Sequence, residues 1–501
     1  MKQDIPHADT PPDLPGGAVI SFEADAGTVA EPDFQTDNPH DASADGVLYD
    51  KSRTVLIRWP PGKPGGVVIP SRVASIGDGA FAGNGLAEIV IPDSVISIGE
   101  RAFEENRLTD LVIGRSVATI GKRAFAGNIH ASNGRWKLIL EMEYESARRI
   151  SGHAGSLAEE LFINSVMEEW KYGNNLLTHV AIPDSVVSIG EQAFAFNFLI
   201  GVTIGNGVTS IGYGAFCGNR LTEIAIPDGV VSIDWEAFAE NQLAGVAVGG
   251  NVVSIGRKAF YGNELTEIVI PDGVASIESE AFAKNPLTDI TIGKGLSSIG
   301  ENAFGEHPGE FTVSGDNPHY ASADGILYDK SLAVLIRCQK VKSGGVAIPS
   351  GVISIGDGAF AGNGLTEIVI PDGVISIGNR AFAGSGLTEV VIPDGVASIG
   401  YGAFLESKLA KVTIGVGVSS IGARAFSCNR LTEVVIPAGV VSIGKSAFAG
   451  NPLTRITIGA NAERTVYDRI LISFARAYLL GGRLAGTYAR PDATSSEWTR
   501  I

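Results

Sequence analysis

A repeat of 22 residues constrains the fold of this chain more than any other feature of its sequence. The dipeptide Ala-Phe recurs at a constant step of 22 residues within each of three runs. Around it the unit reads L-x-x-I-x-I-[PG]-x-x-V-x-S-I-G-x-x-A-F-x-x-N-x, with seven apolar positions. One unit cannot bury seven apolar side chains alone, but stacked units can share a continuous core. The phenylalanines of the dipeptide, which we expect in that core, are Phe81, Phe103, Phe125, Phe194, Phe216, Phe238, Phe260, Phe282, Phe304, Phe360, Phe382, Phe404, Phe426 and Phe448.

Each unit predicts one turn of a solenoid. In the unit that begins at Leu365, alternation places Ile368 and Ile370 on one face of a short strand, and Glu367 and Val369 on the other. A proline or glycine then ends the strand, and residues that tolerate positive φ return the chain. We therefore expect a β-rich solenoid of about fourteen 22-residue coils with a parallel sheet, roughly 65 Å long at the usual spacing of strands.

The unit resembles a known repeat family. L-x-x-I-x-I fits the leucine-rich-repeat pattern L-x-x-L-x-L, and the recurring block I-G-x-x-A-F is similar to the BspA-like, Treponema-type subclass over roughly residues 34–459. The resemblance implies a leucine-rich-repeat solenoid that is not an enzyme and binds proteins, as part of a bacterial cell-surface or secreted adhesin-like protein. Its implied partners are host matrix proteins or other cell-surface proteins. Unlike commoner leucine-rich repeats, this chain has Pro-Asp-Gly or a variant where an asparagine usually follows the strand.

A segment that interrupts the repeat occurs twice, at an offset of 279 residues. The copies read NPHDASADGVLYDKSRTVLIR from Asn38 and NPHYASADGILYDKSLAVLIR from Asn317. A pattern of strand, turn and strand predicts a hairpin that covers or joins stacks of coils. We assign these hairpin segments to 34–66 and about 311–345. Strands that end in Ile-Pro also alternate with strands that end in Ile-Gly, which suggests that the chain was copied in blocks.

The second interruption is an insertion of about 47 residues, at about 129–175. Its stretch RWKLILEMEY leaves strand and helix both open at 135–145, while a capping pattern predicts a helix that starts near Ser156. Such an insertion either packs on the stack or offers a contact to a partner. Trp136 and Trp170 are its candidate contact residues, because tryptophan is enriched in the energetic centres of interfaces.

Both ends of the chain depart from the repeat. Residues 1–33 are expected to be poorly ordered, and the solenoid is expected to span 67–459. In 460–501 the helical spacing of apolar residues predicts a helix that caps the open end of the stack, with Tyr488 and Trp498 docked on it. The stretch MKQDIPHADTPPDLPGG has no apolar region followed by a cleavage site, so we expect no export signal in it. A cytoplasmic location therefore stays an alternative.

Composition and motifs argue against catalysis, nucleic acid and metal binding. A formal net charge of -17 would repel a phosphate backbone, and no apolar run is long enough to span a membrane. Three distant cysteines suggest neither disulfides nor zinc, and no common catalytic motif occurs. Asp316, Asp324 and Asp329 do not have the spacing of a calcium loop. We expect no cofactor, no metal and no membrane span, and we leave the oligomeric state open.

The outward face of the strands carries the candidate protein-binding residues. The third position of the unit is acidic in eight of thirteen cases, and the fifth is small or β-branched throughout. Either these acidic residues keep a wide sheet soluble, or they bind a basic, extended protein surface. Three hypotheses therefore stay open for the function: an adhesin-like protein-binding module, a structural spacer, and an intracellular scaffold that uses the 129–175 insertion to contact its partner. The acidic candidates are Glu88, Asp110, Glu223, Glu267, Asp289, Glu367, Glu389 and Glu433.

Overall fold

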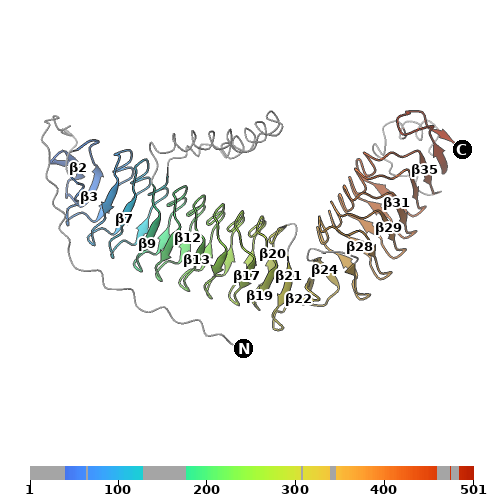
Figure 1. Cartoon of the computed structure of the whole chain (residues 1–501), viewed down its shortest axis with the longest axis horizontal. Helices are drawn as coiled ribbons and strands as arrows, with labels where there is room; N and C mark the ends of the chain where they lie inside the picture. The colour runs from blue at the N-terminus through green and yellow to red at the C-terminus, as the bar shows by residue number, and fades with distance from the viewer. Residues whose placement is uncertain are drawn as a thin grey trace, which may run out of the picture.

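Stacked coils of short strands form an elongated, curved molecule in the computed structural model of the chain (Figure 1). Nearly every coil contributes a strand of two to four residues from L-x-x-I-x-I and a two-residue strand from the following S-I dipeptide, whereas the coil of Phe81 contributes only the second. The fold is therefore a β-solenoid built from the 22-residue unit. The structure describes residues 40–63, 66–127, 176–305, 309–338, 346–459, 474 and 484–501.

The Ser-Ile strands form the continuous parallel sheets of the solenoid. They pair in register, as Ser210 and Ile211 do with Ser232 and Ile233, and belong to one sheet of 12 strands and one of 8. We expected the continuous parallel sheet in the L-x-x-I-x-I stretch of each coil, but it is formed by the Ser-Ile strand that follows this stretch. The first sheet contains β4 (Ser75–Ile76), β6 (Ser97–Ile98), β8 (Thr119–Ile120), β10 (Ser188–Ile189), β12 (Ser210–Ile211), β14 (Ser232–Ile233), β16 (Ser254–Ile255), β18 (Ser276–Ile277) and β20 (Ser298–Ile299). The second contains β26 (Ser354–Ile355), β28 (Ser376–Ile377), β30 (Ser398–Ile399), β32 (Ser420–Ile421) and β34 (Ser442–Ile443).

The longer strands pair in short parallel groups, and proline explains where most groups begin. The N–H of Gly459 donates to the carbonyl oxygen of Ile436 in the preceding coil at 2.9 Å. A coil with proline at that position, such as Pro437, has no N–H to donate backwards, so most ladders start at a proline coil and end at a glycine coil. The groups are β5 (Glu88–Val90) with β7 (Asp110–Val112), β9 (His179–Ile182) with β11 (Gly201–Ile204), β13 (Glu223–Ala225) with β15 (Gly245–Ala247), β17 (Glu267–Ile270) with β19 (Asp289–Ile292) and β21 (Glu310–Val313), β25 (Val346–Ala347) with β27 (Ile368–Val369), β29 (Glu389–Ile392) with β31 (Lys411–Ile414), and β33 (Glu433–Ile436) with β35 (Arg455–Ile458).

The solenoid has about sixteen turns in its described part, which corrects the expected fourteen. Fourteen Ser-Ile or Thr-Ile strands belong to coils with the Ala-Phe dipeptide. Two further turns pass through β3 (Val55–Arg58) and β24 (Val334–Arg337), which pair in parallel with β4 and β26. Sequence reasoning missed them because the hairpin segments lack the Ala-Phe dipeptide by which the coils were counted.

The phenylalanines of the Ala-Phe dipeptide form the centre of the core, as predicted. All fourteen are buried, and thirteen of them, including Phe216, are fully enclosed, while Phe304 is 5% exposed. Their rings stack on those of the neighbouring coils, as Phe216 does on Phe238 with centroids 5.3 Å apart. Burying one such side chain contributes roughly 1.5–3 kcal/mol. The core divides into two clusters, and the coils of each cluster are called the first and the second block below.

The turns G-x-x-A-F-x-x of successive coils form a row along the stack, which we call the ridge. Two residues of nearly every turn adopt positive φ, as Gly214 (φ 58) and Gly218 (φ 69) do. In that turn the N–H groups of Gly214, Phe216 and Gly218 donate to carbonyl groups of the next coil at 2.8, 2.8 and 3.0 Å. The ridge therefore has a direction, with its N–H groups on the C-terminal side of each coil and its carbonyl groups on the N-terminal side.

A buried asparagine near the end of the unit links each coil to its neighbours. The Nδ2 group of Asn241 donates to the carbonyl oxygens of Phe216 and Phe238 at 3.0 and 3.1 Å, and its Oδ1 accepts from the N–H of Leu221 at 3.1 Å. Equivalent bonds recur at Asn263 and other coils. Commoner leucine-rich repeats have an asparagine directly after the strand, and this chain has its structural asparagine in the A-F-x-x-N stretch of the coil instead.

Each hairpin segment forms a three-stranded antiparallel unit that starts a block. The first copy is β1 (Asp41–Ala44), β2 (Val47–Asp50) and β3, and the second is β22 (Tyr320–Ala323), β23 (Ile326–Asp329) and β24. The second copy joins the blocks, because Leu327 belongs to the first core cluster while Ile326 and Tyr328 belong to the second. In the first copy the equivalent Leu48 is half-buried.

The helices expected in 129–175 and in 460–501 are not supported, since the insertion and most of the first part of the tail lie outside the described residues. In the described tail the end of the stack is covered by strands. The strand β36 (Gly486–Ala489) pairs antiparallel with β35, and β37 (Thr499–Arg500) pairs with β36. Phe474 packs edge-on against Tyr488 and Trp498, with ring centroids 5.5 and 5.3 Å apart.

Candidate functional site

The predicted acidic residues lie exposed on the outward face of the longer strands. Seven of them are the first residue of a strand, and Glu367 directly precedes β27. The alternation that buries the isoleucines of each strand also turns these carboxylates to solvent. The exposed candidates are Glu88, Asp110, Glu223, Glu267, Asp289, Glu367, Glu389 and Glu433.

The register divides these carboxylates into separate groups. Glu267, Asp289 and Glu310 stand side by side on three paired strands. Glu88 pairs with Asp110, whereas the side chain of Glu389 accepts from Lys411 at 3.3 Å. Glu223 and Glu433 face a glycine and an arginine on the neighbouring strand. The strongest negative charge therefore lies near the end of the first block, and sequence reasoning missed Glu310 because it preceded a segment classed as a hairpin.

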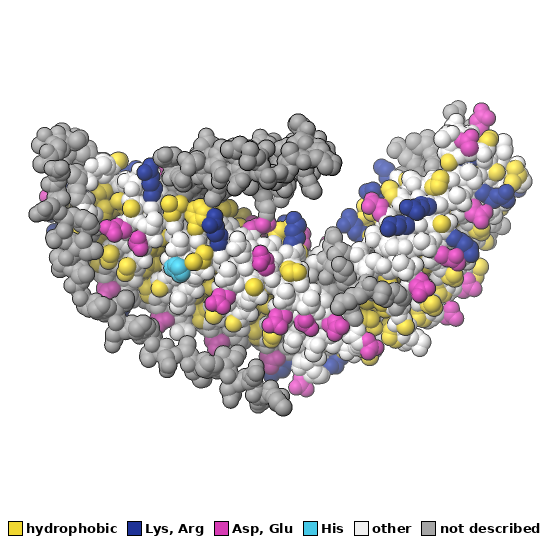
Figure 2. Space-filling view, viewed as in Figure 1, with side chains coloured by type: hydrophobic (Ala, Val, Ile, Leu, Met, Phe, Trp, Pro, Cys, Tyr) yellow, Lys and Arg dark blue, Asp and Glu magenta, His cyan; other side chains and the backbone are white. Residues whose placement is uncertain are grey.

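Exposed valines accompany the carboxylates on the same face. Val269 and Val369 are 59% and 77% exposed, and Val90, Val112, Val391 and Val435 are exposed as well. Figure 2 shows acidic and hydrophobic side chains distributed along the visible length of the molecule. An exposed row of valines beside carboxylates provides apolar area for contact together with charge.

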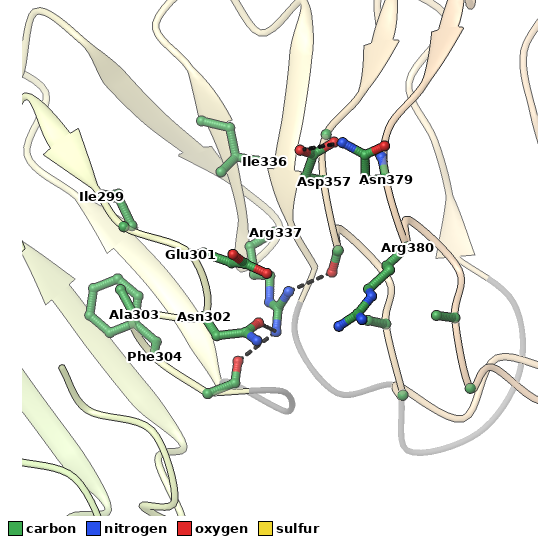
Figure 3. Close-up of a pocket in the computed structure, with 18 of the residues that line it drawn as sticks. Ile299, Glu301, Asn302, Ala303, Phe304, Ile336, Arg337, Asp357, Asn379 and Arg380 are labelled. Atoms are coloured by element: carbon green, nitrogen blue, oxygen red, sulfur yellow. Dashed lines mark hydrogen bonds between the residues drawn. The ribbon is translucent and has the colours of Figure 1, made fainter. Parts of the chain in front are cut away.

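A cleft of about 1100 Å³ separates the ridge of the first block from that of the second (Figure 3). One wall is the turn 301–305 and the other is the turn 357–362. Arg337 bridges the two walls, because its guanidinium donates to the carbonyl oxygens of Gly305 and Gly358, both at 2.5 Å. The cleft thus lies where the second hairpin segment interrupts the row of ridge turns.

Charged and aromatic side chains line this cleft alongside its glycine-rich backbone. Arg380 points into the gap (Figure 3) and lies over the ring of Tyr401, with 5.8 Å between its Cζ atom and the centroid. Hydrogen bonds from Arg424 and Arg380 lower the pKa of the Tyr401 phenol. Acidic residues in the lining are Glu301, Asp357 and Glu406.

A model of the BspA-type leucine-rich repeat region, in six copies, matches residues 65–136, 165–285 and 353–468. These matches cover well over half of the chain. The chain belongs to the BspA-type leucine-rich repeat family.

Solved structures of bacterial leucine-rich repeat proteins match this chain at low identity. One from Bacteroides ovatus is 21% identical, with a TM-score of 0.42, covering 79% of this chain and 92% of that one. One from Eubacterium ventriosum is 24% identical, with a TM-score of 0.41, covering 50% and 83%. A leucine-rich cell surface protein from Faecalibacterium prausnitzii is 21% identical, with a TM-score of 0.38, covering 85% and 90%. Among curated proteins no sequence matches.

The ridge of this BspA-type chain carries an aromatic cluster that sequence reasoning missed. Tyr213 and Trp235 have ring centroids 5.4 Å apart, and Arg257 lies 5.4 Å from the Trp235 ring. Trp235 is 43% exposed, while burial and the charge of Glu236 raise the pKa of Tyr213. The signal in the sequence was an aromatic residue at a position of I-G-x-x-A-F that is charged or polar in most other coils.

Asp329 of the second hairpin segment has a structural role. Asp329 accepts from the N–H of Val334 at 2.7 Å and from the hydroxyl of Ser331, which closes the turn between β23 and β24. Within the described ranges, no group of three potential metal ligands comes together. No helix in the described part of the chain has the length and hydropathy needed to cross a membrane.

The candidate contact residues Trp136 and Trp170 lie outside the described residues. Their role in binding therefore stays a prediction, as does the scaffold that would use the 129–175 insertion. Of the three cysteines, Cys217 is half-buried and Cys428 is exposed, whereas Cys338 is buried in the second block.

Proposed function

We propose that this chain is a non-enzymatic protein-binding module that engages a basic, extended protein surface through the outward face of its longer strands. The observation that carries the proposal is the row of Glu267, Asp289 and Glu310, three carboxylates in register on adjacent strands. Within the described residues none of the three forms an ion pair. We call these three residues the acidic row.

The chemistry of the face favours a cationic partner. Carboxylates on neighbouring strands repel one another, and a lysine or arginine placed between two of them relieves that repulsion. Val269 beside the acidic row adds exposed apolar area. Because all of these groups are exposed, binding would depend on many weak contacts and would weaken as salt screens the charges.

Membership in the BspA-type family is the ground for the proposed location of the module, at a bacterial cell surface or in the secreted fraction. The same membership supports the absence of catalysis as part of the proposal. The main competing function is a structural spacer, which would have no affinity for basic surfaces beyond that of any acidic protein.

The test uses a synthetic peptide of alternating lysine and valine, with a glutamate and valine peptide as its negative control. The row variant carries Glu267→Lys, Asp289→Lys and Glu310→Lys. A matched control variant carries Glu105→Lys, Glu264→Lys and Glu497→Lys, three exposed acidic residues outside the strands, and has the same net charge.

Biolayer interferometry at increasing salt measures the affinity of each protein for the lysine peptide. We expect a loss of tenfold or more in the row variant, against a smaller loss in the control variant. Equal losses in the two variants would show that only net charge matters, and would remove the acidic row from the proposed function.

A further inference from the structure

The hydrogen bonds that link successive ridge turns stop at the first wall of the cleft between the two blocks, the turn 301–305. In the preceding coil the N–H groups of Glu280 and Phe282 donate to carbonyl groups one coil further on, at 3.0 and 2.7 Å. The equivalent N–H groups of Asn302 and Phe304, at the end of the first block, have no acceptor within the described residues. This wall therefore presents backbone donors at alternate residues.

The second wall presents the complementary backbone groups. Inside the second block, the N–H groups of Gly358 and Gly362 donate to carbonyl groups of the next coil at 2.8 and 2.7 Å. One coil earlier, the equivalent carbonyl groups belong to Asp357 and Ala361, and in the described part of the chain they accept no hydrogen bond. Residues with backbone donors thus line one side of the cleft, and residues with backbone acceptors line the other.

Between these two acceptors, the carbonyl oxygen of Ala359 already accepts from the N–H of Cys338 at 2.9 Å. From this arrangement we infer that the cleft binds an extended polypeptide segment of a partner beside the Arg337 bridge, where it pairs with the donors of the first wall and the remaining acceptors of the second. A main chain carries both carbonyl groups for the donors of Asn302 and Phe304 and N–H groups for the acceptors of Asp357 and Ala361. Adding a peptide to an exposed backbone edge is an established mode of recognition in other folds.

A small anion fits the cleft less well than a peptide does. It would satisfy the donors on the first wall, but it has nothing to donate to the carbonyl groups on the second. The charged side chains in the lining also do not favour an anion, because Glu301, Asp357 and Glu406 outnumber Arg337 and Arg380. A polypeptide matches both walls without a net charge.

The side chains that line the cleft define which peptide it suits. Ile299, Ile336 and Phe304 provide an apolar part of the lining, and they favour an apolar residue in the bound segment. Arg380 at the opening suits an acidic residue beside it. The site shares no residue with the acidic row, so it goes beyond the proposed function and stands or falls independently of it.

Variants that fill the cleft test the inference. Ala361 lines the cleft and is half-buried, and the same ridge position holds Tyr261 and Leu405 in other coils. Ala361→Tyr therefore introduces a side chain that the repeat accommodates. The matched control is Ala449→Tyr, the same position in the last coil and equally half-buried, outside the lining. Ala383→Tyr fills the cleft from the next coil and replaces Ala361→Tyr if that variant does not fold.

The probe is a phage-displayed library of random nine-residue peptides, selected on the immobilised full chain. Synthetic copies of the enriched peptides are then titrated by calorimetry. We expect Ala361→Tyr to weaken their binding at least tenfold, and Ala449→Tyr to change it less than twofold. The row variant of the proposed function should bind these peptides as the unmodified chain does. A selection that enriches no peptide, or peptides indifferent to Ala361→Tyr, would overturn the inference.

Amide hydrogen exchange gives a second, independent readout. In the free chain the amides of Asn302 and Phe304 should exchange at least tenfold faster than that of Phe282, and a bound peptide should slow both at least tenfold. If the free chain already protects them as strongly as Phe282, the ladder is closed and no peptide site exists. If sodium sulfate or acetate slows them as much as the peptide does, the cleft is an anion site and the inference of a peptide is wrong.

Discussion

Replacing the buried Asn241 by alanine is expected to lower the free energy of unfolding by about 2–4 kcal/mol. Asn241 is 7% exposed and links its coil to the coil before it. Its Oδ1 atom accepts the N–H of Leu221, and its Nδ2 group donates to the carbonyl oxygens of Phe216 and Phe238. The substitution removes these bonds and a longer one from Nδ2 to the carbonyl oxygen of Ala239 at 3.3 Å, in a place where water does not easily replace them.

The magnitude follows from what each partner retains. The N–H of Leu221 loses its acceptor inside the protein, and an unsatisfied buried donor costs about 1–3 kcal/mol. The carbonyl oxygens of Phe216 and Phe238 each keep a second asparagine donor, Asn219 and Asn263, both at 3.0 Å. A carbonyl oxygen that loses one of its two donors costs less than a buried N–H that loses its only acceptor, and we assign this loss about 0.5–1 kcal/mol for each carbonyl group.

Two further substitutions separate donors from acceptors. Asn241→Ser should cost less than Asn241→Ala, since Ser407 at the same position of another coil donates to the carbonyl oxygen of Phe382 at 2.7 Å. Asn241→Asp should cost more at neutral pH, because its carboxylate would face two carbonyl oxygens in a buried place. Burial and these oxygens would raise the pKa of the introduced carboxyl group in the native state above its unfolded value, so stability should increase as pH falls through that raised pKa.

Urea unfolding and amide exchange at Leu221 measure these effects, and the local readout matters because repeat proteins can unfold in parts. Asn206→Ala, at an exposed asparagine of the preceding coil, is the control and should change stability by less than about 0.5 kcal/mol. A change of less than about 0.5 kcal/mol for Asn241→Ala, or an Asn241→Asp variant more stable than Asn241→Ala at pH 7, would refute the reasoning.

Two other predictions follow from packing and burial. A Cβ atom on Gly249 would lie 2.5 Å from the carbonyl oxygen of Pro227, whereas a Cβ atom on Gly245 would meet nothing within 4 Å. In urea unfolding, Gly249→Ala should therefore lower the free energy of unfolding by about 1–3 kcal/mol, and Gly245→Ala by less than about 0.5 kcal/mol. Equal losses in the two variants would contradict the close approach at Gly249. Burial raises the pKa of Cys338 from 9.0 to about 12 and that of Tyr328 from 10.0 to about 12. Because the unfolded chain ionises these groups first, their contribution to stability is present below about pH 9 and is lost as pH rises from there towards 12. The difference between the urea midpoints at pH 8 and pH 10.5 measures this loss of stability, and Cys338→Ala should make that difference smaller. An unchanged difference in the variant would exclude Cys338 as a cause of the loss.

The core and the outward face of this protein could be predicted from the sequence because both are local properties of the unit. Period and alternation decide which side chains a coil turns inward, and they correctly placed Phe216 in the core and Glu267 in solvent. The family resemblance rested on the same local pattern and is confirmed by the family match.

The relations between coils were harder to predict. The alternation of proline and glycine strand ends suggested copying in blocks, but in the structure it also decides where backbone pairing starts and stops. The repeat pattern included the asparagine position of Asn241 but not its partners, which are backbone groups 20 and 25 residues away. Such partners are invisible in a single unit because they belong to the unit before it.

By itself, the sequence determined the repeat, the buried phenylalanines, the exposed carboxylates and the family, because each depends on residues a few positions apart. The tertiary structure decided which carboxylates stand in one row, that Glu310 joins it, and that a cleft opens between the two blocks. The physical reason is that hydrogen bonds of the solenoid run from coil to coil. Whether the N–H of Phe304 finds an acceptor depends on the next coil in space, and the hairpin segment that follows it in sequence does not supply one in the described residues.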